Sequence, residues 1–181
     1  DVSGRGVPAA LLMAQSVSLL RLILRPGISP AEALRRWNSL LTGRIMPGFF
    51  ITTVLGRIRP STREVELASA GHCAPVLLRN GEAEELSLQG VPPLGLMDAF
   101  IPEDNRLVLC EGDFLLFYTD GLTEAASPTG ELLGRKRLFR ALRQPFASAS
   151  DLLYAVNRCE EAHRGGTEAE DDLTLFLFGF R

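Results

Sequence analysis

Apolar positions recur at helical spacing in two segments at the start of the chain. Residues 7–24 are mostly apolar and are followed by Pro26–Gly27, while Pro8 lies in the first turn, where its missing N–H is not needed. Ser29 opens a capping box, and the apolar positions after it continue through residues 30–43. The pattern predicts two helices, and we expect the first to be buried on most of its faces.

From residue 49 onward the pattern changes to short runs rich in β-branched and aromatic residues. Seven runs are typical of strands, at residues 50–58, 64–68, 75–79, 83–88, 106–110, 114–119 and 173–180. Short turns separate the first six runs in pairs, and Asn80–Gly81 is the sequence expected for a type I′ turn. We therefore expect three hairpins. Two further helices are predicted at residues 131–142 and 150–163.

The order of these elements indicates the fold class. Helices and strands are segregated along the chain, which favours an α+β fold with antiparallel sheet over a doubly wound parallel sheet. No internal repeat, low-complexity tract or linker interrupts the sequence. We expect one domain over residues 1–181.

Composition narrows the function classes. The chain has 46% hydrophobic residues and a net charge of −3 with basic and acidic residues interspersed, which fits a globular domain and argues against a nucleic-acid ligand. The three cysteines form no CxxC pair, which argues against a disulfide framework and a structural zinc site. These features indicate a reducing, cytoplasmic location.

A membrane-spanning segment is not expected. The longest apolar stretch, residues 7–24, is interrupted by polar residues at Gln15, Ser16, Ser18 and Arg21. No signal peptide is visible, and the chain does not begin with Met, so we expect it to be part of a longer protein. We expect no membrane contact from this domain.

Three short acidic motifs stand at the ends of predicted strands. They are Asp1-Val2-Ser3-Gly4, Thr119-Asp120-Gly121 and Glu170-Asp171-Asp172-Leu173-Thr174. Hard divalent cations prefer oxygen ligands, and carboxylates from separate strands can hold two of them. The motifs therefore predict a metal centre if the fold brings them together.

Longer stretches around these motifs carry a resemblance to a known family. They are DVSGRGVPAALLM at residues 1–13, AGHCAP at 70–75, PPLGL at 92–96, YTDGLTEA at 118–125 and DDLTL at 171–175. In this order they resemble the successive signatures of the bacterial metal-dependent protein phosphatases of the SpoIIE type, which are PPM enzymes related to protein phosphatase 2C. The resemblance covers essentially the whole chain.

The resemblance implies a fold and an activity. The fold would be an α/β/β/α sandwich of two antiparallel sheets flanked by helices. The activity would be hydrolysis of phosphoserine or phosphothreonine on a regulatory protein, by a water activated between two Mn²⁺ or Mg²⁺ ions. The substrate would often be a STAS-type anti-anti-sigma factor, and a sensor or regulatory domain would precede the phosphatase in the full-length protein.

The resemblance also assigns residues to the metal centre. Asp1 matches the bridging carboxylate, the backbone carbonyl of Val2 matches a ligand of the second metal, and Asp120 matches the ligand of the Thr-Asp-Gly motif. Asp171 is assigned as the ligand of the last motif, with Asp172 as its supporting neighbour, although the two roles could be exchanged. An isolated Asp-Gly is usually only a turn, so the surrounding motif carries the assignment of Asp120.

Other residues in these motifs have two interpretations. Gly4 and Gly6 are expected to let the backbone pass close to the site, and Gly121 is expected to permit a tight turn after a strand. Arg5, where many relatives have His or Lys, is either a contact for the substrate phosphate or a surface residue that balances nearby acid. His72 is interpreted as a hydrogen-bonded loop residue rather than a general acid, and Cys73 as a packing residue rather than a nucleophile.

One part of the family pattern is missing from this chain. In the family, a strand upstream of the first motif pairs with it and supplies a further acidic ligand, whereas this sequence starts at Asp1. We therefore expect the chain alone to bind metal weakly and to have little activity. Two alternatives are a phosphatase-like domain that only binds a partner, and a hydrolase of small phosphate esters.

Overall fold

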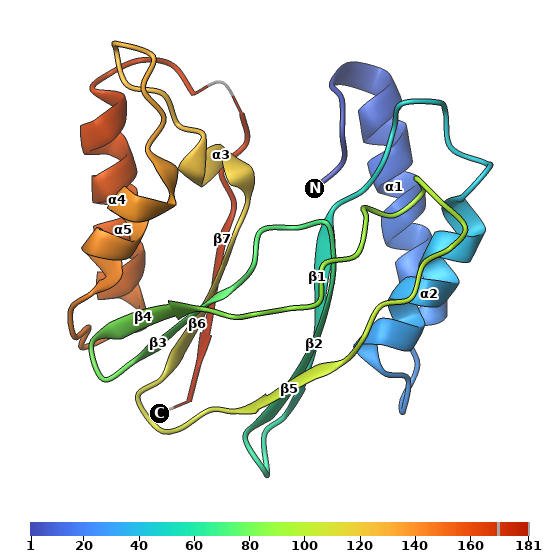
Figure 1. Ribbon diagram of the computed structural model, residues 1–181, viewed down its shortest axis with the longest axis horizontal. Coiled ribbons are helices and arrows are strands. Elements are labelled where there is room, and N and C mark those ends of the chain that lie inside the picture. The colour runs from blue at the N-terminus through green and yellow to red at the C-terminus, as the bar shows by residue number, and fades with distance from the viewer. Residues whose placement is uncertain (170, 181) are drawn as a thin grey trace. The chain divides into compact units, whose positions relative to one another are not determined.

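The computed structural model describes residues 1–169 and 171–180, whose strands form two antiparallel sheets (Figure 1). The chain folds as two units, each with its own sheet. The first unit comprises Asp1–His72 and Ser87–Val108, and the second comprises Cys73–Leu86 and Leu109–Arg181. The two sheets with their helices confirm the predicted α+β class. The assignment of residues 1–181 to one domain stays a prediction.

The first unit contains two helices and a three-stranded sheet. Its elements are α1 (Gly6–Ile23), α2 (Pro30–Leu41), β1 (Thr53–Arg59), β2 (Glu64–Ala70) and β5 (Asn105–Val108), with strand order β1-β2-β5. Helix α2 packs on β2 and β1, and α1 packs against α2 (Figure 1). The core of this unit includes Leu34 and Leu41 of α2, both fully buried, and Ala68 of β2.

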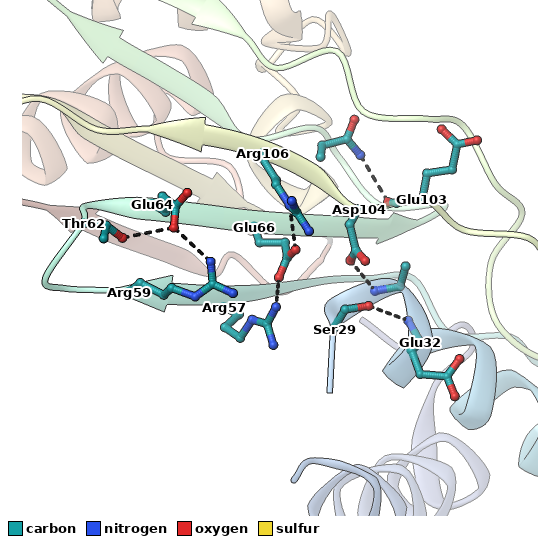
Figure 2. Close-up of polar contacts among 12 residues, drawn as sticks. Ser29, Glu32, Arg57, Arg59, Thr62, Glu64, Glu66, Glu103, Asp104 and Arg106 are labelled. Atoms are coloured by element: carbon teal, nitrogen blue, oxygen red, sulfur yellow. Dashed lines mark hydrogen bonds and ion pairs between the residues drawn. The ribbon is translucent and has the colours of Figure 1, made fainter. Parts of the chain in front are cut away.

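Helix α2 begins where its capping box predicts. The Ser29 hydroxyl accepts a hydrogen bond from the backbone N–H of Glu32 at 3.3 Å, and Pro30 occupies the first helical position (Figure 2). The N–H of Ala31 donates instead to the carboxylate of Asp104 at 2.8 Å. A residue of the loop before β5 therefore satisfies a second N–H of the first turn.

Helix α1 forms as predicted, but its burial does not follow the prediction. Its buried residues are Ala9, Leu12, Ser16 and Ile23, whereas Val7, Leu11 and Leu22 are exposed.

The expectation that no segment is long and apolar enough to span a membrane was also wrong, because α1 meets both criteria. The polar residues within it are too few to lower its apolar character, and one such helix is weak evidence, since helices of soluble proteins pass the same test.

A buried acid links all three strands of the first sheet. Glu66 of β2 is only 4% exposed, and its carboxylate accepts hydrogen bonds from Arg57 of β1 and from Arg106 of β5, the latter at 2.9 Å (Figure 2). The register places Glu66 directly opposite both arginines. The carboxylate is therefore already paired inside the sheet.

The second unit contains a four-stranded sheet and three helices. Its elements are β3 (Val76–Arg79), β4 (Glu82–Glu85), β6 (Phe114–Tyr118), α3 (Asp120–Thr123), α4 (Gly134–Leu142), α5 (Ala149–Arg164) and β7 (Leu175–Gly179), with strand order β4-β3-β6-β7. Helices α4 and α5 pack against each other, with α4 on β4 and α5 on β7 (Figure 1). Leu116, Leu138 and Leu152 are fully buried in this core.

Two of the three predicted hairpins are confirmed. β1 pairs with β2, and β3 pairs with β4 around Asn80 and Gly81, whose φ values of 55° and 79° are both positive, as a type I′ turn requires.

The third predicted hairpin is wrong. β5 pairs with β2, whereas β6 pairs with β3 and β7, so consecutive strands belong to different sheets. The apolar run of β6 needs a neighbour on each side, and β3 and β7 provide them. Between β5 and β6, the Asp113 carboxylate accepts a hydrogen bond from the N–H of Cys110 at 2.6 Å and closes a tight turn. Such a turn looks the same in the sequence whether or not its two strands pair.

Candidate metal centre

Asp120 lies directly after the central strand β6 of the second unit. Thr119 is extended and precedes the short helix α3, of which Asp120 is the first residue. The backbone carbonyl of Asp120 accepts hydrogen bonds from the N–H of Glu124 at 2.8 Å and from the hydroxyl of Thr123 at 3.2 Å. These bonds use the main chain of Asp120 and fix its position, and its side chain is half-buried at the end of the sheet.

The last acidic motif lies beside Asp120, because β7 pairs with β6 in register Tyr118 with Leu175. The N–H of Asp172 donates to the carboxylate of Asp171 at 2.8 Å, and both residues are exposed. Glu170, which precedes them in the motif, lies outside the described residues. The structure thus brings together the turns that carry Asp120 and the Asp171–Asp172 pair, while the choice between these two as ligand stays a prediction.

A threonine joins these two turns. The Thr119 hydroxyl donates to the backbone carbonyl of Asp172 at 3.0 Å and accepts from the N–H of Thr174 at 2.9 Å. The N–H of Thr119 also donates to the carbonyl of Thr174 at 3.2 Å. The sequence analysis did not identify this role, although a threonine in each motif, Thr119 and Thr174, was the available signal.

Gly121 serves a different purpose from the tight turn that we expected. A Cβ atom on Gly121 would lie 2.6 Å from the backbone carbonyl oxygen of Asp172, closer than real Cβ contacts allow. Glycine is therefore required because the chain before β7 passes directly over α3, and not because of an unusual φ value. This close approach keeps the two acidic turns adjacent.

The first acidic motif is held in the first unit by a short antiparallel bridge. The N–H of Thr52 donates to the carbonyl of Asp1 at 2.9 Å, and the N–H of Ser3 donates to the carbonyl of Phe50 at 3.0 Å. Val2 lies opposite Ile51 between these two bonds, so the bridge does not use the Val2 carbonyl. The proposed backbone ligand is thus compatible with the observed pairing.

The glycines of this motif shape the approach to α1. Gly4 and Gly6 have φ values of 84° and 76°, which a residue with a Cβ rarely adopts. Arg5 lies between them as the residue that precedes α1, and its side chain makes no capping hydrogen bond. Its assignment as a phosphate contact or a surface residue stays open.

The surroundings of His72 and Cys73 agree with the interpretation of both as structural residues. Nδ1 of His72 lies 2.7 Å from the Thr52 hydroxyl within the first unit. Cys73 packs against the core of the second unit, where burial and then the carboxylate of Asp120 raise the pKa of its thiol. Because the thiolate is the reactive form, this environment disfavours a nucleophilic role.

The predicted ligands are divided between the two units. Asp120, Asp171 and Asp172 belong to the second unit, whereas Asp1 and Val2 belong to the first. Within either unit, the residues that the structure describes include no group of three His, Cys, Asp or Glu side chains close enough to hold a metal ion. The second unit does provide carboxylate and carbonyl oxygens in adjacent turns, a donor set that suits hard divalent cations.

Comparisons with known proteins give a consistent result over the whole chain. The family model described as Stage II sporulation protein E (SpoIIE) matches residues 1–181. Protein IcfG of Synechocystis sp. is 32% identical over 203 residues, covering 97% of this chain and 32% of that protein. Phosphoserine phosphatase RsbU of Bacillus subtilis is 25% identical over 152 residues, covering 83% of this chain and 45% of that protein. The chain thus spans less than half the length of these relatives.

Solved structures show a similar fold. The SiaA-PP2C domain of Pseudomonas aeruginosa superposes with a TM-score of 0.83 at 20% identity, covering all of this chain and 73% of that one. The RsbU and RsbW domains of Rv1364c from Mycobacterium tuberculosis superpose with a TM-score of 0.75 at 30% identity, covering 98% of this chain and 49% of that one. RsbX in complex with magnesium superposes with a TM-score of 0.66 at 18% identity, covering 97% of this chain and 75% of that one.

Proposed function

Since this chain belongs to the SpoIIE family, with the PP2C-type fold that its motifs predicted, we propose that it is the phosphatase domain of a longer regulatory protein. The proposed reaction is metal-dependent hydrolysis of phosphoserine or phosphothreonine on a protein. The observation that supports it most directly is the pairing of the Asp120 turn with the Asp171–Asp172 turn through Thr119.

The proposed cofactors are two divalent cations, Mn²⁺ or Mg²⁺. Asp120 and Asp171 would hold metal in the second unit, where adjacent turns offer oxygen donors. Asp1 and the Val2 carbonyl are assigned as ligands by the family resemblance, and that assignment stays a prediction. When bound, such cations supply a water that ionises near neutral pH and neutralise charge on the phosphoryl group.

The residues of this chain have definite tasks in that scheme. Thr119 fixes the distance between the two acidic turns, and Gly121 allows the chain that carries Asp172 to pass close to α3. The thiol of Cys73 remains protonated beside Asp120, because its pKa is raised. Cys73 is therefore not assigned as a nucleophile, and in the proposed reaction the attacking group is water.

The proposed substrate is a phosphorylated regulatory protein in a partner-switching system, specifically a STAS-type anti-anti-sigma factor. The relative RsbU is a phosphoserine phosphatase, which supports this substrate class. The greater length of the relatives supports an additional sensor or regulatory domain in the full-length protein. The proposed location is the cytoplasm, which suits the three free cysteines.

A comparison of substrates tests this proposal. The full-length protein should release phosphate from a phosphoserine STAS protein with a kcat/KM far above that for p-nitrophenyl phosphate, and only when Mn²⁺ or Mg²⁺ is supplied. Equal kcat/KM values would instead indicate a hydrolase of small phosphate esters. Absence of hydrolysis with every phosphorylated probe would favour a domain that only binds a partner.

A further inference from the structure

Helix α4 of the second unit presents an open basic groove that the metal centre does not use. The groove has a volume of about 680 Å³ and is lined by Glu85, Arg135, Lys136, Phe139, Arg140 and Arg143. Four of these six side chains are cationic, and Phe139 is a half-buried apolar surface among them. The groove therefore combines positive charge with an apolar contact.

Glutamates of β4 balance the positive charges at the two ends of the groove. Arg135 forms an ion pair with Glu85, and Arg143 lies 4.0 Å from Glu82. Arg137 binds Glu131 at 2.7 Å and does not line the groove. These three arginines are thus occupied by acids of the same unit.

The charges at the centre of the groove are not balanced in this way. Lys136 and Arg140 are exposed and lie one turn apart on α4, and neither forms an ion pair with any acid in residues 1–169 or 171–180. Their positive charge is therefore available to a ligand.

The groove starts near the acidic turns within the same unit. Glu85, which pairs with Arg135 at one end, is opposite Val76 of β3, and Val76 is in turn opposite Leu116 of β6. β6 ends at Tyr118, two residues before Asp120, which begins α3, and α3 contacts α4. The groove thus extends along α4 from the end of the sheet that carries Asp120.

We propose that this groove docks an acidic segment of the phosphoprotein substrate, with carboxylates on Lys136 and Arg140 and an apolar side chain on Phe139. The proposal rests on the proposed function and deepens it, because it adds a specificity site outside the metal centre. Charges at such a surface accelerate encounter and select partners, and their effect decreases with salt.

A short acidic segment fits the groove better than a long polyanion. Helix α4 has nine residues, which corresponds to roughly 13 Å. The adjacent strand β4 contains Glu84 besides the paired Glu82 and Glu85, so it offers no positive charge to a nucleic-acid backbone that continued past the groove. The positive field is therefore confined to the length of a few peptide residues.

Charge reversal in the full-length protein tests the proposal. The variant Lys136→Glu/Arg140→Glu is compared with Arg21→Glu/Arg158→Glu, which makes the same change in net charge at exposed arginines outside the groove. The acidic probes are two phosphoserine peptides, one with a Glu- and Leu-rich arm before the phosphoserine and one with the arm after it. The other probes are the same two peptides with Gln in place of Glu, and p-nitrophenyl phosphate.

We expect the wild type to prefer the acidic peptides by about tenfold in kcat/KM, through a lower KM. The groove variant should lose this preference and the control should keep it, with unchanged turnover of p-nitrophenyl phosphate in both. Retention of the preference by the groove variant would overturn the proposal.

Binding measured without catalysis separates failure of this proposal from failure of the proposed function. Fluorescence anisotropy of the labelled acidic peptide should show weaker binding to the groove variant than to the control, even if no phosphorylated probe is hydrolysed. Equal binding to both variants, or tighter binding of a single-stranded oligonucleotide than of the peptide, would overturn the docking proposal.

Discussion

The two units hold their acidic motifs in different ways. In the second unit, five residue pairs between β6 and β7 and the hydrogen bonds of Thr119 fix the turns of Asp120 and Asp172 side by side. In the first unit, a short bridge to residues 50–52 holds Asp1 and Val2. In the second unit, a paired strand and the uncharged side chain of Thr119 therefore position the turns that carry the carboxylates. In the first unit, a few main-chain hydrogen bonds hold the acidic motif.

The two units also contain deeply buried acids that are already paired, and Glu66 and Asp113 are the two most buried of them. Glu66 is 4% exposed and binds Arg57 and Arg106, while Asp113 is 2% exposed and binds Arg79 and the N–H of Cys110. The motif residues Asp1, Asp120, Asp171 and Asp172 are half-buried or exposed instead. Burial therefore separates the structural carboxylates from the candidate ligands in both units.

The largest expected effect is on catalysis, through the second unit. Asp120→Asn should lower metal-dependent phosphatase activity by about 100-fold or more, because it removes a charged metal ligand, while the fold is retained. Steady-state phosphate release with Mn²⁺ measures the effect. The exposed Asp98 of the first unit gives a matched control, and Asp98→Asn should remain active. Full activity of Asp120→Asn would remove Asp120 from the metal centre.

The next effect concerns stability and compares the two buried acids. Glu66→Gln and Asp113→Asn should each lower the free energy of unfolding by roughly 2–4 kcal/mol, because each leaves arginine partners without a buried carboxylate. Urea unfolding of both variants measures the change. Glu64, which is partly exposed and binds Arg59, is a control, since Glu64→Gln should leave the free energy of unfolding nearly unchanged. Similar small effects for all three would contradict the structural role of the buried pairs.

A feature of the fold could be predicted from the sequence where residues close together in the chain determine it. The capping of α2 by Ser29 and the positive φ values at Asn80 and Gly81 follow from residues within one turn, so the sequence predicts them correctly. The separation of β5 and β6 into different sheets depends on partners far along the chain.

The same distinction applies to the candidate site. The motifs identify the acids and place Asp120 and Asp171 at strand ends. The hydrogen bonds between Thr119 and the turn of Asp172 join residues 53 positions apart, and the contact of Gly121 with Asp172 depends on the same long-range pairing. Such contacts have no local pattern, so only the structure reveals them.

A smaller effect should follow when the link between the two turns is removed. Thr119→Val deletes a hydroxyl that both donates and accepts, which should lower stability by about 1–2 kcal/mol and Mn²⁺ affinity by about tenfold. Thermal unfolding and Mn²⁺ titration measure the two changes. Thr129→Val is a control, because the Thr129 hydroxyl forms its hydrogen bond with Ser127 in an exposed turn far from the acidic motifs in the sequence. Unchanged Mn²⁺ affinity in Thr119→Val would show that the link does not position the ligands.

The smallest effect is at high pH and concerns Tyr118 at the end of β6. Burial, with a minor contribution from Cys73, raises its pKa to about 12, compared with about 10 in an unfolded chain. Stability should therefore be unaffected below about pH 10 and should fall as the pH rises towards 12, because only the unfolded state ionises in that interval. Phenolate absorbance should show a late step that Tyr118→Phe removes, and a step near pH 10 alone would contradict the burial of this side chain.

Calorimetric titration of Mn²⁺ into the full-length wild type and three variants tests the central claim most directly. The wild type and Asp172→Asn should bind Mn²⁺ with similar affinity, while Asp120→Asn and Asp171→Asn should each bind at least about tenfold more weakly. Loss of affinity in Asp172→Asn alone would exchange the roles of Asp171 and Asp172. Wild-type affinity in both Asp120→Asn and Asp171→Asn would contradict a metal centre at the paired ends of β6 and β7.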